Sequence, residues 1–464
     1  MRGLTVLVGL VLLSAGCSQA AAPAAAGPKA GQYSGSIGAA TYLVDIPPHW
    51  NRALLLYSHG YAAPTGGNPA SDAGDPTTKA WLLENGYALA GSSYSGTGWA
   101  LADAFQDQVA LLDAFGRKFG KPSRTIAWGH SLGGIITAGL VQLHPELFAG
   151  ALPMCGVLAG AIANWNGALD LGFATRILLD PALQVARITD PGANLTRARA
   201  AVTAANSTPE GKARLALIAS FGYLPGWFNP ILPEPPEGDF AAQEANQASW
   251  EGFDFTYVFA FRAELEKRAG GNPSWNTDVD YRAAFTESPS KPEVEALYRA
   301  AGLNLEADLN RIQSSPRISA DPEAVDYLNR NISFNGRLGV PVLTLHTTGD
   351  GLVVVENEAA YADVVAAGPD AARLRQLYVH RANHCIFTPA EQIAAFQVLF
   401  ERIERGTWSD TGALAMNGLA AALGAKYNGG SLPGSSAPIT IPPAFLDFAP
   451  PAFPRPFDSR TARP

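Results

Sequence analysis

A serine stands between glycines at residues 127–134, AWGHSLGG, directly after a run of apolar residues. Gly129, Ser131 and Gly133 form the pattern G-x-S-x-G, and the apolar segments on either side predict a strand, a tight turn and a helix. Such a turn strains the serine backbone and raises its hydroxyl above the sheet, while the N-terminus of the helix stabilises negative charge beside it. Ser131 is therefore the predicted nucleophile; the alternative is a purely structural Gly/Ser turn.

A serine nucleophile needs two backbone N–H groups that stabilise the oxyanion. The residue after the nucleophile, Leu132, supplies the first. The second should come from the loop after an earlier strand, where residues 57–64 read YSHGYAAP. The His-Gly-Tyr there resembles the H-G-x element of esterases and lipases, which makes the backbone N–H of Tyr61 the second predicted donor. His59 is expected to be structural.

The acid and the base should follow the serine in the order Asp, then His. Residues 340–353, VPVLTLHTTGDGLV, form an apolar strand followed by a Gly-Asp turn, so Asp350 is placed at the carboxyl end of a strand. The alternative role for Asp350 is to cap that turn. A loop between a strand and a helix holds His384, and we favour it as the base over His380, which lies in the strand itself.

Further strands at 53–60, 87–96 and 123–130 alternate with helical segments such as 100–120. This alternation predicts an α/β fold with a mostly parallel sheet flanked by helices on both faces.

With Ser131, Asp350 and His384 in this order, residues 31–156 and 335–405 resemble the α/β-hydrolase fold superfamily. The tight turn that carries the serine, GHSLGG, looks like the corresponding turn of lipases and carboxylesterases. Prolyl-type exopeptidases of this fold more often have G-G-S-[WY]-G at that place. The resemblance implies a serine hydrolase that cleaves carboxylic esters through an acyl-enzyme, without a cofactor. An exopeptidase of the same fold, and a non-catalytic binding protein of that fold, are the alternatives.

The remaining segments complete the predicted organisation. Residues 1–30 are read as a signal peptide and linker, residues 157–334 as a mainly helical cap inserted after the sixth strand, and residues 406–464 as an extension packed on the core. The ending LSAGC looks like a bacterial lipobox, with Ser14 where leucine is usual, and makes Cys17 a candidate for lipidation. Export without a lipid anchor is the alternative.

If Cys17 is removed or lipidated, Cys155 and Cys385 remain, and both are expected on the same rim of the sheet. Tannase-like esterases, which the chain resembles here, tie the region of the catalytic histidine with a disulfide, although their partner cysteine adjoins the serine. The resemblance implies a disulfide between Cys155 and Cys385; two buried free thiols are the alternative.

Composition limits the partners. The chain has 464 residues and a net charge of −8 that is spread along its length, with no basic stripe that would bind nucleic acid. No pattern typical of a metal site or a nucleotide-binding loop occurs. We therefore expect an exported enzyme, extracellular or held at the cell envelope, whose partner is a small or polymeric ester, with membrane contact only through a lipid on Cys17.

Overall fold

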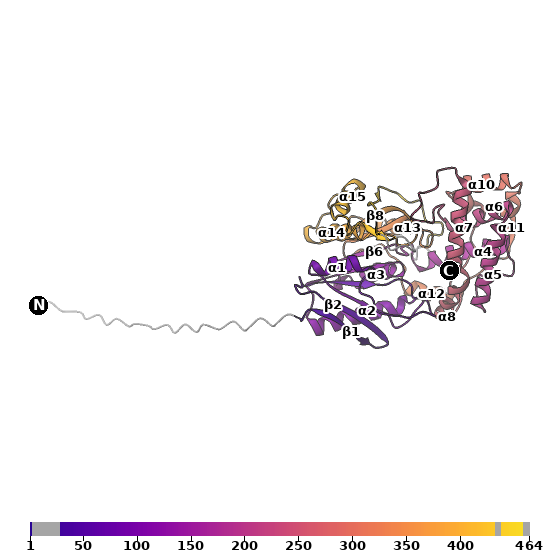
Figure 1. Cartoon of the computed structure of the whole chain (residues 1–464). Coiled ribbons are helices and arrows are strands. Elements are labelled where there is room, and N and C mark those ends of the chain that lie inside the picture. The colour runs from indigo at the N-terminus through magenta and orange to yellow at the C-terminus, as the bar shows by residue number, and fades with distance from the viewer. Residues whose placement is uncertain (2–27, 432–437, 458–464) are drawn as a thin grey trace.

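The computed structural model describes Met1 and residues 28–431 and 438–457. Most of the predicted signal segment, including Cys17, lies outside the described residues. The central feature is a sheet of nine strands in the order β1-β2-β4-β3-β5-β6-β7-β8-β11 (Figure 1). Its strands are β1 Gly31–Ile37, β2 Ala40–Ile46, β3 Ala53–Ser58, β4 Ala88–Ser92, β5 Arg124–His130, β6 Gly150–Met154, β7 Val342–Gly349, β8 Leu374–Ala382 and β11 Phe445–Leu446.

Neighbouring strands from β4 to β8 in this order run parallel, while β1, β2 and β11 pair antiparallel at the two edges. Every residue of β3, ALLLYS, is buried, as expected for a parallel strand covered on both faces. A separate pair, β9 Gly429–Ser431 and β10 Pro438–Thr440, is antiparallel. The predicted mostly parallel sheet flanked by helices is confirmed.

Successive side chains of the central strands enter different cores. Leu54 and Leu56 of β3 belong to the cluster that includes α2 (Leu101–Phe119), α3 (Leu132–Leu143) and α13 (Glu356–Ala366). Leu55 and Tyr57 belong to the cluster that includes α1 (Pro76–Glu84), α14 (Pro389–Arg405) and α15 (Ala413–Ala422). The period of two follows from the pleat of a strand, so both faces of the sheet are apolar and both carry helices.

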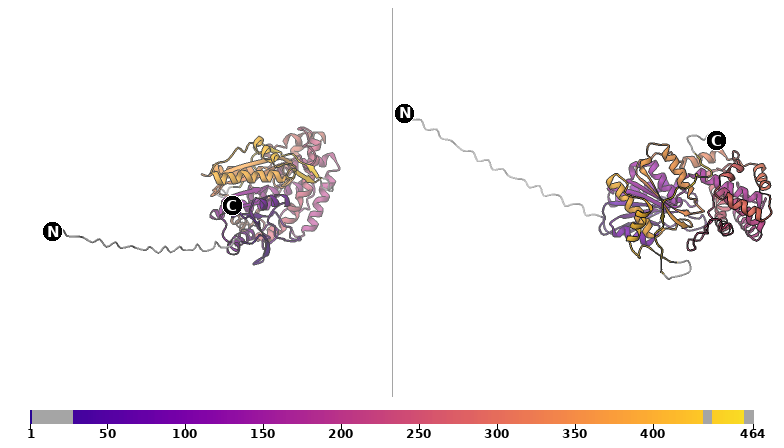
Figure 2. Two further views of the ribbon diagram at one scale, coloured as in Figure 1. Left: turned by 60° about the vertical axis from the view of Figure 1, so that its left-hand side comes forward. Right: turned by 90° about the horizontal axis from the view of Figure 1, so that it is seen from above.

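The chain leaves the sheet after β6 and returns at β7. Between them lie α4 Ala161–Leu178, α5 Pro191–Ala205, α6 Pro209–Gly222, α7 Phe240–Thr256, α8 Arg262–Ala269, α9 Tyr281–Glu287, α10 Lys291–Ala300, α11 Leu305–Ser314 and α12 Pro322–Arg330. Many of these helices share a hydrophobic core of their own. The views in Figures 1 and 2 place most of them together beside the sheet. We call this segment the insertion.

The C-terminal arm, residues 441–457, contacts both parts of the molecule. Its strand β11 pairs with β8 of the sheet, as an extension packed on the core would. Beyond β11, Phe453 is buried against Ala163 of the insertion, and the Arg455 guanidinium lies 2.6 Å from the Asp170 carboxylate of α4. The arm therefore ties the insertion to the sheet, a contact that its Pro/Phe-rich sequence does not predict.

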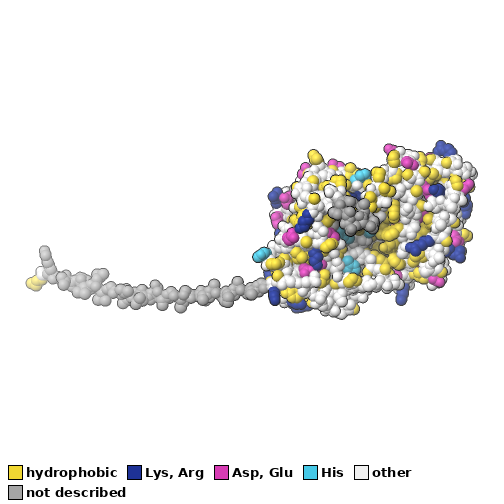
Figure 3. Space-filling model, in the orientation of Figure 1, with side chains coloured by type: hydrophobic (Ala, Val, Ile, Leu, Met, Phe, Trp, Pro, Cys, Tyr) yellow, Lys and Arg dark blue, Asp and Glu magenta, His cyan; other side chains and the backbone are white. Residues whose placement is uncertain are grey.

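The surface is mixed in charge. On the face seen in Figure 3, acidic and basic side chains are interspersed among hydrophobic and uncharged groups. No helix within the described ranges is both long enough and apolar enough to cross a membrane.

Candidate active site

Ser131 occupies the tight turn between β5 and α3, with φ 58° and ψ −123°. This left-handed backbone is rare for a residue with a side chain and is typical of a strained nucleophile turn. The flanking glycines are required by space, because a Cβ at Gly129 or at Gly133 would collide with the carbonyl oxygen of Ser58. The loop after β3 and the turn are thus packed backbone against backbone.

The predicted oxyanion donors lie beside this serine. A Cβ at Gly60 would stand 3.4 Å from the Ser131 Cβ, so the loop that carries Tyr61 passes directly against the nucleophile. Leu132 opens α3, and within the described residues the N–H groups of Leu132 and Tyr61 donate to no acceptor. His59 holds the loop, since its Nε2 lies 3.1 Å from the Ser93 carbonyl. Its role is structural, and burial lowers its pKa.

The predicted acid and base are hydrogen bonded to each other. His384 Nδ1 donates to Asp350 Oδ2 over 2.6 Å, while the Val353 N–H donates to Asp350 Oδ1 over 3.0 Å. Burial alone would raise the pKa of Asp350, but the charge of His384 and the interactions with His346 and His384 outweigh burial and lower this pKa to about 2. Asp350 is therefore ionised at neutral pH and fixes which imidazole nitrogen of His384 carries the proton.

A second histidine supports this carboxylate. His346 on β7 is fully buried, with Nε2 2.8 Å from the Val353 carbonyl and 3.6 Å from Asp350 Oδ2, and Nδ1 3.1 Å from Glu358 Oε1. Burial lowers its pKa, but Asp350 and Glu358 overcome that effect and raise it to about 10. The sequence gives no role to His346, because its partners lie on the next loop and on α13 and become apparent only in the fold.

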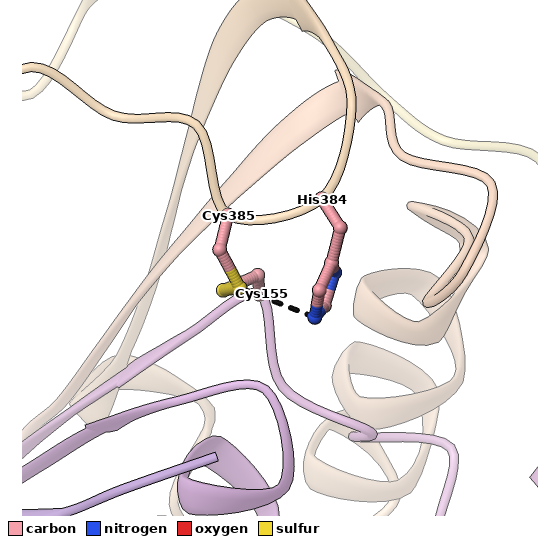
Figure 4. A group of neighbouring side chains, drawn as sticks. All are labelled: Cys155, His384 and Cys385. Atoms are coloured by element: carbon pink, nitrogen blue, oxygen red, sulfur yellow. Dashed lines mark hydrogen bonds between the residues drawn. A yellow bond between two sulfur atoms is a disulfide. The ribbon is translucent and has the colours of Figure 1, made fainter. Parts of the chain in front are cut away.

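A disulfide fixes the base loop to the sheet. Cys155, directly after β6, is bonded to Cys385, with their Cα atoms 5.4 Å apart (Figure 4). Next to this bond, His384 Nε2 lies 3.3 Å from the Cys385 Sγ. Cys155, Asn383 and Cys385 all have positive φ, so the backbone is strained on both sides of the bond.

The nucleophile and the base loop are connected through β6. The Ser131 N–H donates to the Met154 carbonyl over 3.0 Å, and Met154 precedes the disulfide cysteine Cys155. Within the described residues the Ser131 hydroxyl makes no hydrogen bond, to His384 or to any other group. Catalytic hydrogen bonds are often long in the free enzyme and tighten once substrate is bound.

Among the described residues, one group has donor atoms that could hold a metal ion, since those of Cys155, His384 and Cys385 lie within 4.8 Å of one another. Both sulfurs are bonded to each other, so neither is a thiolate, which is the form that binds metals. These three residues are therefore better explained as a disulfide that fixes the loop of His384 than as a metal site.

Reduction of this disulfide should destabilise the protein and lower its activity. The bond closes a loop with a sequence separation of 230, for which chain entropy predicts a contribution of about 5 kcal/mol at most. We expect a lower Tm in the presence of a reductant, together with a lower kcat because the strained loop around His384 loses its anchor. Calorimetry and ester turnover with and without the reductant measure both effects.

The matched control is the double variant Cys155→Ala/Cys385→Ala. It should resemble the reduced protein and show no response to the reductant. An unchanged Tm and turnover of the natural chain after complete reduction would contradict the assigned role of the bond.

A cavity of about 110 Å³ joins the nucleophile to the insertion. From the core it is lined by Ser131, Leu132 and Tyr61. From the insertion it is lined by apolar groups such as Trp165 and Leu171, and the C-terminal arm adds Phe453. The arrangement places the nucleophile and the two residues that carry the predicted N–H donors on the wall of a partly open, mainly apolar cavity.

Comparison with known proteins agrees with this chemistry. Residues 81–166, which include the nucleophile turn, match the model of the prolyl oligopeptidase family. The chain is 28% identical over 422 residues to o-phthalyl amidase from Xanthobacter agilis, covering 82% of this chain and 89% of that protein.

Two similar solved structures come from Aspergillus oryzae. One is an esterase, with a TM-score of 0.42 and 16% identity, covering 80% of this chain and 78% of that chain. The other is feruloyl esterase B, with a TM-score of 0.39, 15% identity and the same coverage.

The parallel sheet, the serine turn between β5 and α3, and the matched family and amidase relative all indicate one group of enzymes. The chain is a serine hydrolase and belongs to the α/β-hydrolase superfamily.

Proposed function

We propose that the protein hydrolyses carboxylic esters of compact acyl groups through an acyl-enzyme on Ser131. His384 removes the proton from the Ser131 hydroxyl as it attacks the carbonyl carbon, and Asp350 stabilises the imidazolium that forms. The N–H groups of Tyr61 and Leu132 bind the oxyanion. The leaving alcohol takes the proton from His384, and a water then attacks the acyl-enzyme by the same route to release the acid.

The main support for compact acyl groups is the cavity that Ser131, Tyr61 and Leu132 line together. Its volume of about 110 Å³ is of the order of the space that a single aromatic ring fills. Its walls are mostly Leu, Val, Trp and Tyr, which favours a flat apolar acyl group over a long chain.

A second candidate is hydrolysis of the corresponding amide, and the relative from Xanthobacter agilis favours it. That protein is named an o-phthalyl amidase, and it shares most of its length with this chain. Ester and amide cleavage use the same acyl-enzyme and differ in the leaving group, so one series of substrates separates them.

The test is the ratio of kcat/KM across matched substrates. We expect p-nitrophenyl acetate and benzoate to exceed the laurate by about tenfold or more, because one missing or added group in an apolar pocket is worth ~1–3 kcal/mol. The benzoyl p-nitroanilide tests amide cleavage, and the prolyl and aminoacyl p-nitroanilides test peptide cleavage, each against the esters. Faster cleavage of an anilide than of every ester would replace the ester assignment with an amidase or peptidase.

Residues of the insertion should determine the order of kcat/KM among esters of different acyl length. Leu171→Ala enlarges the wall of the cavity and should shift the preference towards longer acyl chains, whereas Leu169→Ala on the same helix alters a buried leucine that does not line it. An equal ranking in both variants would mean that the insertion does not contact the acyl group.

We also propose that the chain is exported, with Cys17 as the site of a lipid anchor. The disulfide supports this, because such bonds persist in oxidising compartments. Globomycin-sensitive processing of the precursor would support the anchor, and an identical mature protein from the Cys17→Ser variant would exclude it.

A further inference from the structure

Three polar side chains on the insertion side of the cavity form no side-chain hydrogen bond to any residue that the structure describes. Asp254 lies in the last turn of α7, Tyr257 directly follows that helix, and Asn164 lies on α4; all three line the cavity that contains Ser131. Asp254 is 5% exposed, and its Oδ1 is fully enclosed without a hydrogen bond. Within the described residues, the second Asp254 oxygen, the Tyr257 hydroxyl and the Asn164 amide also form none.

The unpaired oxygen of Asp254 is unusual, because buried polar groups in folded proteins are almost always hydrogen bonded. Tyr257 and Asn164 are half-buried. The local backbone is also irregular, since α7 passes into a π-helical turn, Tyr257–Phe261, at this place. Such turns within helices are frequent at functional sites. An unpartnered carboxyl next to a π-turn therefore indicates a group that receives its partner from a ligand.

The three side chains lie close to the reacting centre. The ring of Tyr257 packs edge-on against that of Tyr61, with 5.4 Å between the centroids, and Tyr61 belongs to the predicted oxyanion loop. Asp254 lines the same cavity as Ser131, which places this carboxyl near the nucleophile as well. A ligand group that reached Asp254 would therefore be attached to the acyl part of a substrate held at Ser131.

The chemistry of the lining determines which group fits. Neither lysine nor arginine is among the described residues that line the cavity. Burial, reinforced by the charge of Asp350, raises the pKa of Asp254 well above its usual value and so favours the neutral form of this carboxyl. A carboxylic acid kept neutral in this way donates a hydrogen bond, as do a tyrosine hydroxyl and an asparagine amide.

We propose that Asp254, Tyr257 and Asn164 form a subsite that donates hydrogen bonds to an oxygen acceptor, a carboxylate or a carbonyl, on the acyl group of the substrate. The proposal rests on the proposed function, since it assigns the acyl group a polar substituent. An ammonium group on the acyl part of the substrate would not suit this subsite, because it donates hydrogen bonds and requires an ionised Asp254 as its acceptor.

The first test is turnover of four p-nitrophenyl esters: benzoate, and benzoates that carry a carboxylate, a carboxamide or an aminomethyl group in the ortho position. We expect the natural enzyme to favour the carboxylate or the carboxamide over plain benzoate by about tenfold or more. Asp254→Leu should abolish this preference, measured as the ratio of kcat/KM for the substituted ester to kcat/KM for plain benzoate within the same variant. Asp254→Asn should retain part of it, because the amide still donates.

The matched control is Glu244→Gln, which alters another buried acid on α7 that does not line the cavity. It should behave like the natural enzyme. Comparing turnover of the ortho-carboxylate ester with turnover of the ortho-carboxamide ester shows whether the subsite prefers a charged or a neutral acceptor.

A second readout does not depend on turnover. The corresponding substituted benzamides should protect Ser131 from a fluorophosphonate probe, and the acceptor-bearing ones should do so at about tenfold lower concentration in the natural enzyme than in Asp254→Leu. The variants should all react with the probe when no benzamide is present. Absence of ester turnover together with this protection would overturn the proposed function and leave the subsite in place.

Equal protection in the natural enzyme and in Asp254→Leu would overturn the subsite. Tighter protection by the aminomethyl compound, lost in Asp254→Leu, would also overturn it, because the carboxyl would then bind a cation.

Discussion

Replacing Ser131 by alanine is expected to lower kcat for every substrate of the enzyme by about 10⁴- to 10⁶-fold, the loss that follows removal of a nucleophile acting as a unit with its base. The reason is local, since Ser131 has the strained φ of 58° at the start of α3 and lines the cavity with the two N–H donors. Steady-state turnover of p-nitrophenyl esters measures the effect.

Ser123→Ala is the matched control for this change. Ser123 is an exposed serine at the entrance to the same strand, where its hydroxyl bonds the Arg52 carbonyl. It should keep full activity. Residual turnover of Ser131→Ala within a hundredfold of the natural enzyme would remove the serine from the mechanism.

Asp350→Asn should lower kcat by about 10⁴-fold with little change in KM, because a neutral amide neither holds the required tautomer of His384 nor stabilises its charged form. The carboxylate is fully enclosed and lies 2.6 Å from His384 Nδ1, so no solvent charge replaces it. With its pKa at about 2, Asp350 should not limit activity on the acid side of the pH profile above pH 4.

Asp45→Asn provides the same chemical change far from the site. Asp45 on β2 pairs with Lys79 at 2.6 Å, so its loss should lower Tm and leave kcat unchanged. If both variants lose activity to the same extent, the effect of Asp350→Asn is one of stability and the assignment of the acid is wrong.

The sequence predicts the parts of the site that depend on local structure. The nucleophile turn is a local pattern in the sequence, because the glycines of G-x-S-x-G lie within two residues of Ser131, although the carbonyl that leaves no room for their side chains belongs to Ser58. The helix after the base also has a local signal, since Thr388 and Glu391 form the capping box that begins α14. Asp350 and His384 follow from their order and from their position after strands, and the structure brings these two together.

The rest depends on contacts between distant segments. His346 acquires its role from Glu358 on α13, and nothing in the strand sequence marks that pairing. Asp254 has the spacing of an ordinary helix surface residue, and its burial depends on how the insertion packs against the loop of Tyr61. Phe453 reaches the cavity through an arm that first joins the sheet at β11.

Covalent trapping shows directly whether Ser131 is the nucleophile. The folded protein is treated with a fluorophosphonate probe, reduced and digested with trypsin, and the modified residue is located by mass spectrometry. If Ser131 is the nucleophile, one adduct forms, on Ser131 within the peptide of residues 125–176, and none forms in Ser131→Ala. An adduct on any other residue, or a labelled Ser131→Ala protein, would contradict this assignment.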